Sequence, residues 1–380
     1  MAKKLKKNLL TAIECVLVVL IGGFSIHFID EWLGEEQPKV ENIIYMIGDG
    51  MGVAHISAAQ ISQDYAPLAM ERAHFVGLAK TYSANNRITD SAAAGTALST
   101  GHKTNNGMIG VTPDSLHVSS IREKAERAGM PTGVVVTYPA TNATPAAFVA
   151  HVDNRHKEDE IATFYISNKV DVFMGGGSKR FNQRADSLNL FDTLRERGYT
   201  IASSLSEVKT INEGQVAVLP TEDSMPSYLG GRGDFLPEAT AKTLEILGNN
   251  AKKERTGFFL MVEGSQIDGK AHGHDLEGMI AELKDFDRAV EVAFNYADTH
   301  PGTLVVVTAD HETGGLTIVN GNRKFDLHDH QVDYAWTTGG HTGGMVPIFA
   351  YGTGAEHFSG VFENNDIPKI MCRLLGLDKE

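Results

Sequence analysis

The chain has 380 residues, of which 42% are hydrophobic and 22% are charged, so it is long enough for one large globular core. Its formal net charge of −14 argues against non-specific nucleic-acid binding, which depends on Lys and Arg neutralising phosphates. With only Cys15 and Cys372, the folded part cannot have a disulfide framework. If a protein with this negative net charge binds an anion, it needs positive charge concentrated at the binding site. A bound metal ion would supply that charge.

The N-terminus is rich in lysine and continues into an apolar stretch from Ile13 to Phe28. This pattern is typical of an export signal, although no clear Ala-x-Ala cleavage site follows it. The alternative is a short membrane anchor, for which Glu14 and His27 are unfavourable. We expect residues 1–28 to be a signal peptide or membrane anchor, residues 29–40 a linker, and residues 41–380 the folded domain.

Apolar runs that predict buried strands alternate with helical patterns along the chain. The expected strands are Asn42–Ile47, Gly133–Thr137, Val170–Met174, Gly257–Val262, Leu304–Ala309 and Pro347–Tyr351. The expected helices are Val118–Ala128, Leu188–Arg197, Ala239–Leu247 and Met279–Tyr296. Near-continuous apolar runs favour parallel strands covered on both faces. We therefore predict one α/β domain with a central, mainly parallel sheet flanked by helices, and irregular loops at 221–237 and 320–340.

Side chains that can bind a metal stand next to four of these runs. Asp49 and Glu263 each follow a run, Asp310 and His311 follow another, and His341 precedes the last. Ligands of α/β sheets gather beyond the carboxyl ends of the strands, and carboxylate with imidazole suits zinc. Taken singly, an Asp in a turn or a surface His is the more ordinary interpretation. The hypothesis of a metal site depends on their joint occurrence.

Asp268 and His272 follow the strand that ends before Glu263 and are four residues apart. If this segment is helical, both side chains lie on one face and can share a metal. His274 is close enough to be the alternative ligand.

Ser91 opens the small-residue stretch Ser91–Ala94, which is typical of a helix start. Ser at such a place is commonly an N-cap, and that is the alternative interpretation. A helix N-terminus also favours anions, so a phosphate esterified to Ser91 would be stabilised there. No histidine base stands near it in the sequence, and metal coordination of the hydroxyl would make a base unnecessary. These features together suggest metal-assisted phosphoryl transfer through Ser91.

The chain resembles the alkaline phosphatase family over nearly all of its length after residue 40. The stretches that carry the resemblance are Ile47–Gly52, Thr89–Ala97, Ala143–Arg155, Phe258–Asp268, Thr308–His311 and His341–Tyr351. The resemblance implies hydrolysis of small-molecule phosphate monoesters to alcohol and inorganic phosphate, through a phosphoserine at Ser91. It also implies a homodimer, exported to the periplasm or anchored in the membrane facing it.

The resemblance further implies two zinc ions and one magnesium ion. The zinc beside Ser91 would take Asp49, Asp310 and His311; the second zinc would take Asp268, His272 and His341; the magnesium would take Asp49, Thr144 and Glu263. Arg155 resembles the family's phosphate clamp, because its planar fork binds two phosphate oxygens at once. The alternative for Arg155 is a surface ion pair.

Two positions depart from the family pattern. Asn142 stands where many bacterial relatives carry an Asp near the magnesium, and Gly269 stands where family members often carry a side chain that helps hold phosphate. Lys270 is a candidate substitute for the latter. The rival functions are a phosphodiesterase or sulfatase on the same scaffold and an inert exported binding protein, which would be expected to lack one of the reacting groups.

Overall fold

The computed structural model of the protein describes residues 39–320 and 332–378. The expected signal peptide or anchor at residues 1–28 and most of the expected linker lie outside the described residues, so this division of the chain stays a prediction. Part of the expected irregular region 320–340 also lies outside them. Among the described residues, no helix combines the length and the apolar character needed to cross a membrane.

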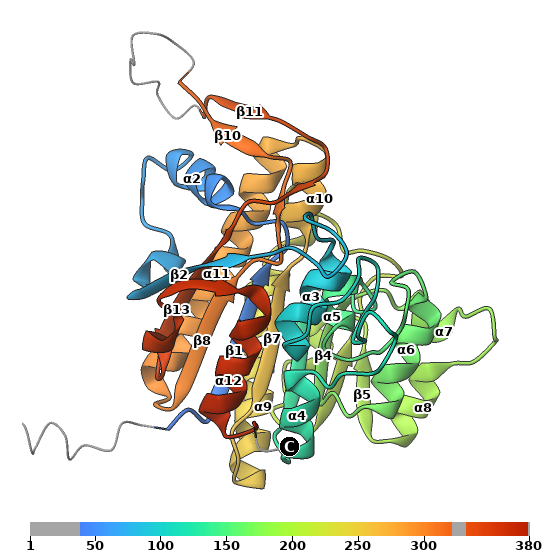
Figure 1. The fold of residues 1–380 in the computed structure, drawn as a ribbon. Helices are drawn as coiled ribbons and strands as arrows, with labels where there is room; N and C mark the ends of the chain where they lie inside the picture. Colours follow the sequence, from blue (N-terminus) through green and yellow to red (C-terminus); the bar gives the residue numbers. More distant parts are fainter. Residues whose placement is uncertain (1–38, 321–331, 379–380) are drawn as a thin grey trace, which may run out of the picture. The chain divides into compact units, whose positions relative to one another are not determined.

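A ten-stranded sheet forms the centre of the described domain (Figure 1), in the order β14-β2-β13-β8-β1-β7-β3-β4-β6-β5. The strands are β1 (Asn42–Gly48), β2 (Phe75–Lys80), β3 (Thr132–Pro139), β4 (Val172–Gly176), β5 (Tyr199–Ala202), β6 (Gln215–Val218), β7 (Phe259–Gly264), β8 (Thr303–Thr308), β13 (Val346–Gly352) and β14 (Gly360–Glu363). Neighbouring strands are parallel except where β13 is a partner. The predicted mainly parallel sheet is confirmed.

Strand β13 runs antiparallel to both β8 and β2. We expected its apolar run to be one of the parallel strands, and that direction was wrong, because a strand buried on both faces shows the same pattern either way. An antiparallel strand begins at the edge where its parallel neighbours end. The segment that precedes β13, including His341, therefore still reaches the carboxyl edge of the sheet.

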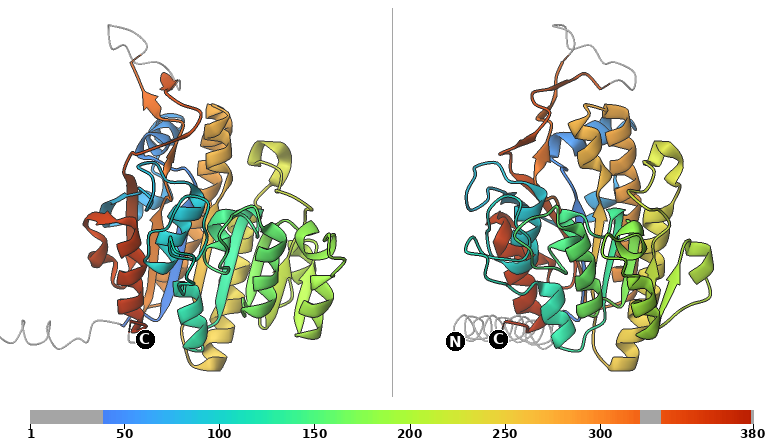
Figure 2. Two further views of the ribbon diagram at one scale, coloured as in Figure 1. Left: turned by 45° about the vertical axis from the view of Figure 1, so that its right-hand side comes forward. Right: turned by 90° about the vertical axis from the view of Figure 1, so that its right-hand side faces the viewer.

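Helices cover both faces of the sheet (Figures 1 and 2). The long helices α9 (Phe235–Glu254) and α11 (Leu276–Thr299) pack together on one face, whereas α3 (Ser91–Thr100), α4 (Ile121–Arg127) and α12 (Ile367–Leu375) pack together on the other. The other helices are α2 (Val53–Ile61), α5 (Ala143–Ala146), α6 (Glu158–Ser167), α7 (Lys179–Asn182), α8 (Leu190–Glu196) and α10 (Gln266–His272). Short 3₁₀ or π turns occur at Ala69–Arg72, Leu205–Val208, Tyr228–Arg232, Ala355–Phe358 and Asn364–Asp366.

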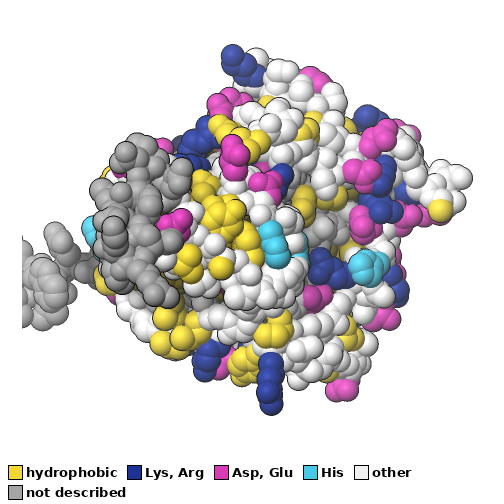
Figure 3. Space-filling model, turned by 90° about the horizontal axis from the view of Figure 1, so that it is seen from above, with side chains coloured by type: hydrophobic (Ala, Val, Ile, Leu, Met, Phe, Trp, Pro, Cys, Tyr) yellow, Lys and Arg dark blue, Asp and Glu magenta, His cyan; other side chains and the backbone are white. Residues whose placement is uncertain are grey.

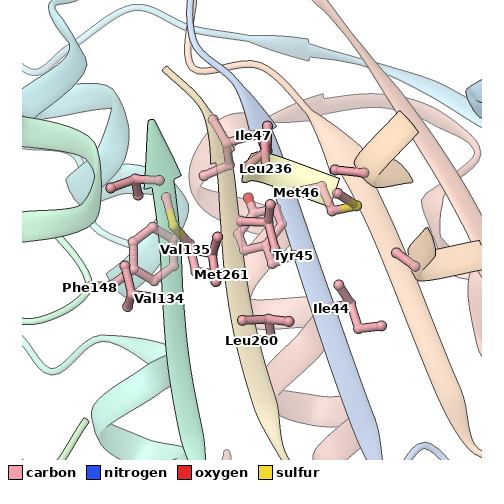
Figure 4. Packing of buried hydrophobic residues seen from close by; sticks show 14 of the residues in the cluster. Ile44, Tyr45, Met46, Ile47, Val134, Val135, Phe148, Leu236, Leu260 and Met261 are labelled. Carbon is pink, nitrogen blue, oxygen red and sulfur yellow. The ribbon is translucent and has the colours of Figure 1, made fainter. Parts of the chain in front are cut away.

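The core fills the space between the middle strands and these helices (Figure 4). Tyr45 of β1, Val134 of β3 and Met261 of β7 are fully buried there. The ring of Phe148 meets that of Tyr45 edge to face, with centroids 5.9 Å apart. Full burial of a large apolar side chain stabilises the fold by roughly 1.5–3 kcal/mol. The densely packed strands therefore hold the loops at their ends in fixed positions.

All four expected helices are present, and α9 and α11 extend beyond the predicted ranges at both ends. Several elements were not predicted, among them β2, β5, β6 and β14. Strands β5 and β6 have only four residues each, which is too short for a periodic pattern to be read reliably.

Candidate active site

Three neighbouring strand ends bring the predicted acidic and histidine side chains to one edge of the sheet. Asp49 follows β1, Glu263 lies at the end of β7, and Asp310 and His311 follow β8. Strand β1 pairs with both β7 and β8, so these ends are adjacent. Seen from this edge, histidine side chains lie at the surface close to basic and acidic side chains (Figure 3).

The first cluster consists of Asp49, Asp310 and His311, all buried. The Nε2 atom of His311 lies 3.0 Å from Oδ2 of Asp310 and 3.5 Å from Oδ1 of Asp49. The other oxygen of Asp310 accepts a 3.0 Å hydrogen bond from the backbone N–H of Gly50. This contact fixes the carboxylate relative to the turn that carries Asp49. Three ligand atoms thus converge on one point.

Ser91 lies beside this cluster as the first residue of α3. Asp90, not Ser91, is the N-cap, because the Asp90 side chain accepts a 3.0 Å hydrogen bond from the backbone N–H of Ala93. The alternative interpretation of Ser91 as the cap is therefore wrong, and its hydroxyl is not used for capping. The Oγ atom of Ser91 instead lies 3.2 Å from Nε2 of His311.

The second cluster consists of Asp268, His272 and His341. As expected, Asp268 and His272 lie on one face of a helix, α10, with His272 Nε2 3.3 Å from Oδ1 of Asp268. His341 stands on β12 (His341–Thr342), which pairs with β9 (Glu312–Thr313) directly after the first cluster. Its Nε2 lies 3.1 Å from that of His272 and 3.6 Å from Oδ1 of Asp268.

Backbone carbonyls hold both histidines of the second cluster in place. The Nδ1 atom of His272 lies 2.7 Å from the carbonyl of Gly339, and that of His341 lies 2.8 Å from the carbonyl of Thr89. Such contacts orient a histidine so that its Nε2 can bind a metal.

His274, the alternative ligand, points elsewhere. Its Nε2 lies 2.8 Å from the carbonyl of Thr338, and its ring stacks on Trp336 with centroids 5.3 Å apart. The structure therefore favours His272 over His274 as the partner of Asp268.

Three buried side-chain oxygens around the first cluster have no hydrogen-bond partner among the described residues. They are Oδ1 of Asp49, Oγ1 of Thr144 and Oε1 of Glu263. Leaving a buried polar atom unpaired costs about 1–3 kcal/mol. Carboxylate and hydroxyl oxygens suit magnesium, and carboxylate with imidazole suits zinc. This donor set fits bound metal cations.

Arg155 lies at the N-terminus of α3 beside Ser91. Its guanidinium donates to Oδ2 of Asp90 over 3.1 Å, and the same oxygen accepts a 3.0 Å hydrogen bond from the backbone N–H of Gly107. Asp90 thus both caps the helix and holds the arginine. The guanidinium remains partly exposed, so its other N–H groups can reach an anion at the mouth of the site.

The model of the family described as alkaline phosphatase matches residues 40–330 and 319–377. Alkaline phosphatase 4 of Bacillus subtilis is 31% identical, with the alignment covering 99% of this chain and 98% of that protein. The solved structure of the alkaline phosphatase from the Antarctic bacterium TAB5 is 37% identical, with the match covering 90% of this chain and 99% of that one, and superposes with a TM-score of 0.84. The chain belongs to the alkaline phosphatase family. It is a metal-dependent phosphomonoesterase.

Two further relatives bear on metals and substrates. A variant of the TAB5 enzyme, 36% identical with a TM-score of 0.83 and covering 90% of this chain and 99% of that one, has magnesium bound in its M3 site. The streptomycin-6-phosphate phosphatase of Streptomyces griseus is 30% identical over 88% of this chain and 90% of that protein.

Negative charge is concentrated in the site of this alkaline phosphatase. Burial, with the carboxylate of Asp310 as the next cause, raises the pKa of Asp49 well above its usual value. Burial also raises the pKa of Glu263 to about 8. Both shifts arise because carboxylates are crowded in a water-poor place, where cations would restore their charged form.

The two departures from the family pattern are both in the site region. The Oδ1 atom of Asn142 accepts a 2.8 Å hydrogen bond from the backbone N–H of Ala143 at the start of α5. Gly269 lies in α10 directly after Asp268. Lys270 does not substitute for a side chain at 269, because its Nζ binds Asp275 over 3.0 Å.

Thr313 is a site residue that the sequence did not reveal. Its hydroxyl donates to Oδ1 of Asp268 over 2.6 Å and lies 3.1 Å from Nδ1 of His311, so it links the two clusters. A signal existed, since residues two apart on an extended segment lie on the same side. Asp90 was missed because its role depends on Arg155, which is distant in the sequence.

Proposed function

We propose that the enzyme hydrolyses phosphate monoesters through a phosphoserine at Ser91, with two zinc ions and one magnesium ion. The observation that carries this proposal is the position of the Ser91 hydroxyl. It stands at the N-terminus of a buried helix, 3.2 Å from Nε2 of His311 and next to the cluster of Asp49 and Asp310. A nucleophile, cation ligands and a helix end that favours anions thus meet at one point.

The donor atoms support the assignment of three metals. The zinc beside Ser91 would be held by Asp49, Asp310 and His311; the second zinc by Asp268, His272 and His341; the magnesium by Asp49, Thr144 and Glu263. When bound, such metals stabilise negative charge on the oxygens that enter and leave phosphorus and lower the pKa of water.

The residues of the chain then perform two in-line displacements. In the first, Oγ of Ser91 gives up its proton and forms a bond to phosphorus while the ester P–O bond breaks, and the leaving alkoxide takes up a proton in exchange and departs as the alcohol. In the second, water attacks the phosphorus of phosphoserine, Oγ of Ser91 leaves and regains a proton, and inorganic phosphate is released. Arg155 binds two phosphoryl oxygens in both steps. Two inversions give net retention of configuration at phosphorus.

The decisive experiment is hydrolysis of p-nitrophenyl phosphate by the full chain supplied with zinc and magnesium, beside Ser91→Ala and a chelator-treated sample. We expect turnover in the first sample only, together with a serine-linked phosphate trapped at low pH. An unchanged rate in Ser91→Ala would refute the nucleophile. Faster turnover of bis-p-nitrophenyl phosphate, or of a sulfate ester, would instead favour a diesterase or a sulfatase.

We also propose that the enzyme is exported, to the periplasm or to the membrane facing it, and forms a homodimer. The lysine-rich start followed by an apolar stretch supports export. Fractionation of cells that express the full chain would test the location, and sedimentation of the purified protein would test the oligomeric state.

A further inference from the structure

The Tyr138 side chain occupies the place that a side chain at position 269 would fill. A Cβ atom built on Gly269 would lie 2.3 Å from the hydroxyl of Tyr138 and 3.5 Å from its Cζ. Apart from its chain neighbours and the backbone of α10, no other atom of the described residues lies within 4 Å of it. The hydroxyl therefore stands directly over the first turn of α10, next to Asp268. Because Gly269 has no side chain, the hydroxyl fits there without a clash.

The backbone of Tyr138 is fixed to the strand end that carries Glu263. Its N–H donates to Oγ of Ser265 over 3.3 Å, and Ser265 in turn donates to Oε2 of Glu263 over 2.6 Å. Tyr138 is half-buried, and its hydroxyl makes no hydrogen bond to any residue in 39–320 or 332–378. The hydroxyl, next to Asp268, is therefore available to donate to a ligand.

A tyrosine hydroxyl is neutral at neutral pH, because its ordinary pKa is about 10. It can donate a hydrogen bond to an anionic oxygen without adding negative charge to the site.

We propose that the Tyr138 hydroxyl donates a hydrogen bond to the phosphoryl group in the site, and that Gly269 is needed to leave it room. Tyr138 is then a substrate-binding residue on β3. Its hydroxyl contacts the phosphoryl group, whereas Gly269 on α10 has no side chain to do so. The inference rests on the proposed function, because it takes the phosphoryl group to lie between the metal clusters and Arg155.

The test measures binding of inorganic phosphate by calorimetry, in the zinc- and magnesium-loaded Ser91→Ala protein, where no phosphoserine can form. Tyr138→Phe should weaken phosphate binding about tenfold, the effect of losing one hydrogen bond to a charged group. Tyr296→Phe is the matched control, since the Tyr296 hydroxyl lies 2.9 Å from the place of a Cβ on Gly248, away from the site. It should bind phosphate as the parent does.

Gly269→Ala gives an independent test. Its methyl group should displace the Tyr138 hydroxyl and weaken phosphate binding by a similar factor. In the double variant with Tyr138→Phe, the loss should be no greater than in either single variant, because one contact is removed in all three. Unchanged phosphate affinity in Tyr138→Phe would overturn the proposal, whether or not this variant still binds magnesium.

The two proposals fail in different ways. If the wild-type protein bound phosphate but did not cleave p-nitrophenyl phosphate, the proposed reaction would fail while the role of Tyr138 could still be measured. If the wild type turned over normally and Tyr138→Phe bound phosphate like its parent, only the role of Tyr138 would be lost.

Discussion

Arg155 and Asp90 form a pair in which one residue positions the other. The carboxylate of Asp90 accepts hydrogen bonds from the guanidinium of Arg155 and from two backbone N–H groups. The arginine is therefore held near Ser91 before a substrate arrives, which lowers the entropy cost of binding. Its remaining N–H groups are free to form the two parallel bonds that a phosphate favours.

Replacing Arg155 with Ala should lower kcat/KM for p-nitrophenyl phosphate by roughly tenfold to a hundredfold, the value of one or two charged hydrogen bonds. Arg155→Lys should recover only part of this loss, because an ammonium keeps the charge but not the planar fork. Arg180→Ala, which removes an ion pair with Glu158, is the control and should leave kcat/KM unchanged. Wild-type kinetics in Arg155→Lys would contradict the clamp.

At the residue scale, the sequence predicted the side chains that follow strand ends, such as Asp49 and Asp310, because their neighbours identify the strand. It did not predict Tyr138 or Thr313. Their importance arises from contacts with α10, and no pattern within β3 or β9 shows which helix each will face. The sequence identified Gly269 as a departure from the family pattern. It could not show that the Tyr138 side chain occupies the space that a side chain at position 269 would fill.

Among the secondary-structure elements, α4 is joined to the segment after α5 by the pair of His151, which is partly buried, and Glu123, which is buried. Nε2 of His151 lies 2.8 Å from Oε1 of Glu123, and its Nδ1 lies 2.7 Å from the carbonyl of Gly110. Burial opposes a charged imidazole, but the Glu123 carboxylate outweighs it and raises the pKa of His151 above its usual value. Burial is likewise outweighed at Glu123, whose pKa is lowered mainly by His151.

This pair should stabilise the fold most in mildly acidic solution. A histidine whose folded pKa is raised contributes fully below its unfolded pKa of about 6.5, and the contribution is lost as the pH rises through the folded pKa. Glu123 contributes above about 4.5 and loses its contribution as the pH falls through its lowered folded pKa. His151→Gln should therefore cost about 1–3 kcal/mol near pH 6 and less near pH 9. Urea unfolding of both proteins across this range checks it, and a cost that grew with pH would refute the charged pair.

A second buried network fixes the loop before α9 to α11. Arg232 donates to Asp285 over 2.7 Å and also pairs with Glu282, and all three side chains are buried. Glu282 also accepts a 2.7 Å hydrogen bond from the backbone N–H of Tyr228. The sequence predicted this region to be irregular but gave no sign of what orders it, because its partners lie about 50 residues away on α11.

Arg232→Met should destabilise the fold by about 3–5 kcal/mol, because it leaves the buried carboxylate of Glu282 without a cation and leaves Asp285 with Arg288 alone. Adding Glu282→Leu should recover part of that loss, since one unpaired charge is removed. Denaturant midpoints of the single and double variants test this. An additive or greater loss in the double variant would show that Glu282 has another essential partner.

At the scale of the whole molecule, the sequence predicted the class of fold because buried parallel strands leave long apolar runs. The order of the strands and the direction of β13 could not be predicted, since both depend on pairings between distant segments. The antiparallel course of β13 nevertheless matters for the site: it starts at the carboxyl edge of the sheet and so brings His341 next to His311, with ring centroids 3.5 Å apart.

Removing metal should destabilise the domain as well as abolish its activity. The site sits where β1, β7 and β8 end, so the carboxylates that those strands bring together repel one another unless cations lie between them. Bound metal stabilises a fold by RT ln(1 + [metal]/Kd), about 4 kcal/mol at a thousandfold excess over Kd. Chelation should then lower the melting temperature, on the order of 5–10 °C for a domain of this size.

Calorimetry of the chelated protein, before and after zinc and magnesium are restored, measures this effect. Asp49→Asn is the informative variant, because Asp49 is the carboxylate proposed to bind both a zinc and the magnesium. Its melting temperature should respond less to added metal than that of the wild type, since two sites lose a charged ligand. His274→Ala should respond as the wild type does, because His274 contacts Thr338 and Trp336 and not the clusters. A melting temperature that did not change with metal in the wild type would mean that the clustered carboxylates are already neutralised by protons, and that cations are not what holds these strand ends together.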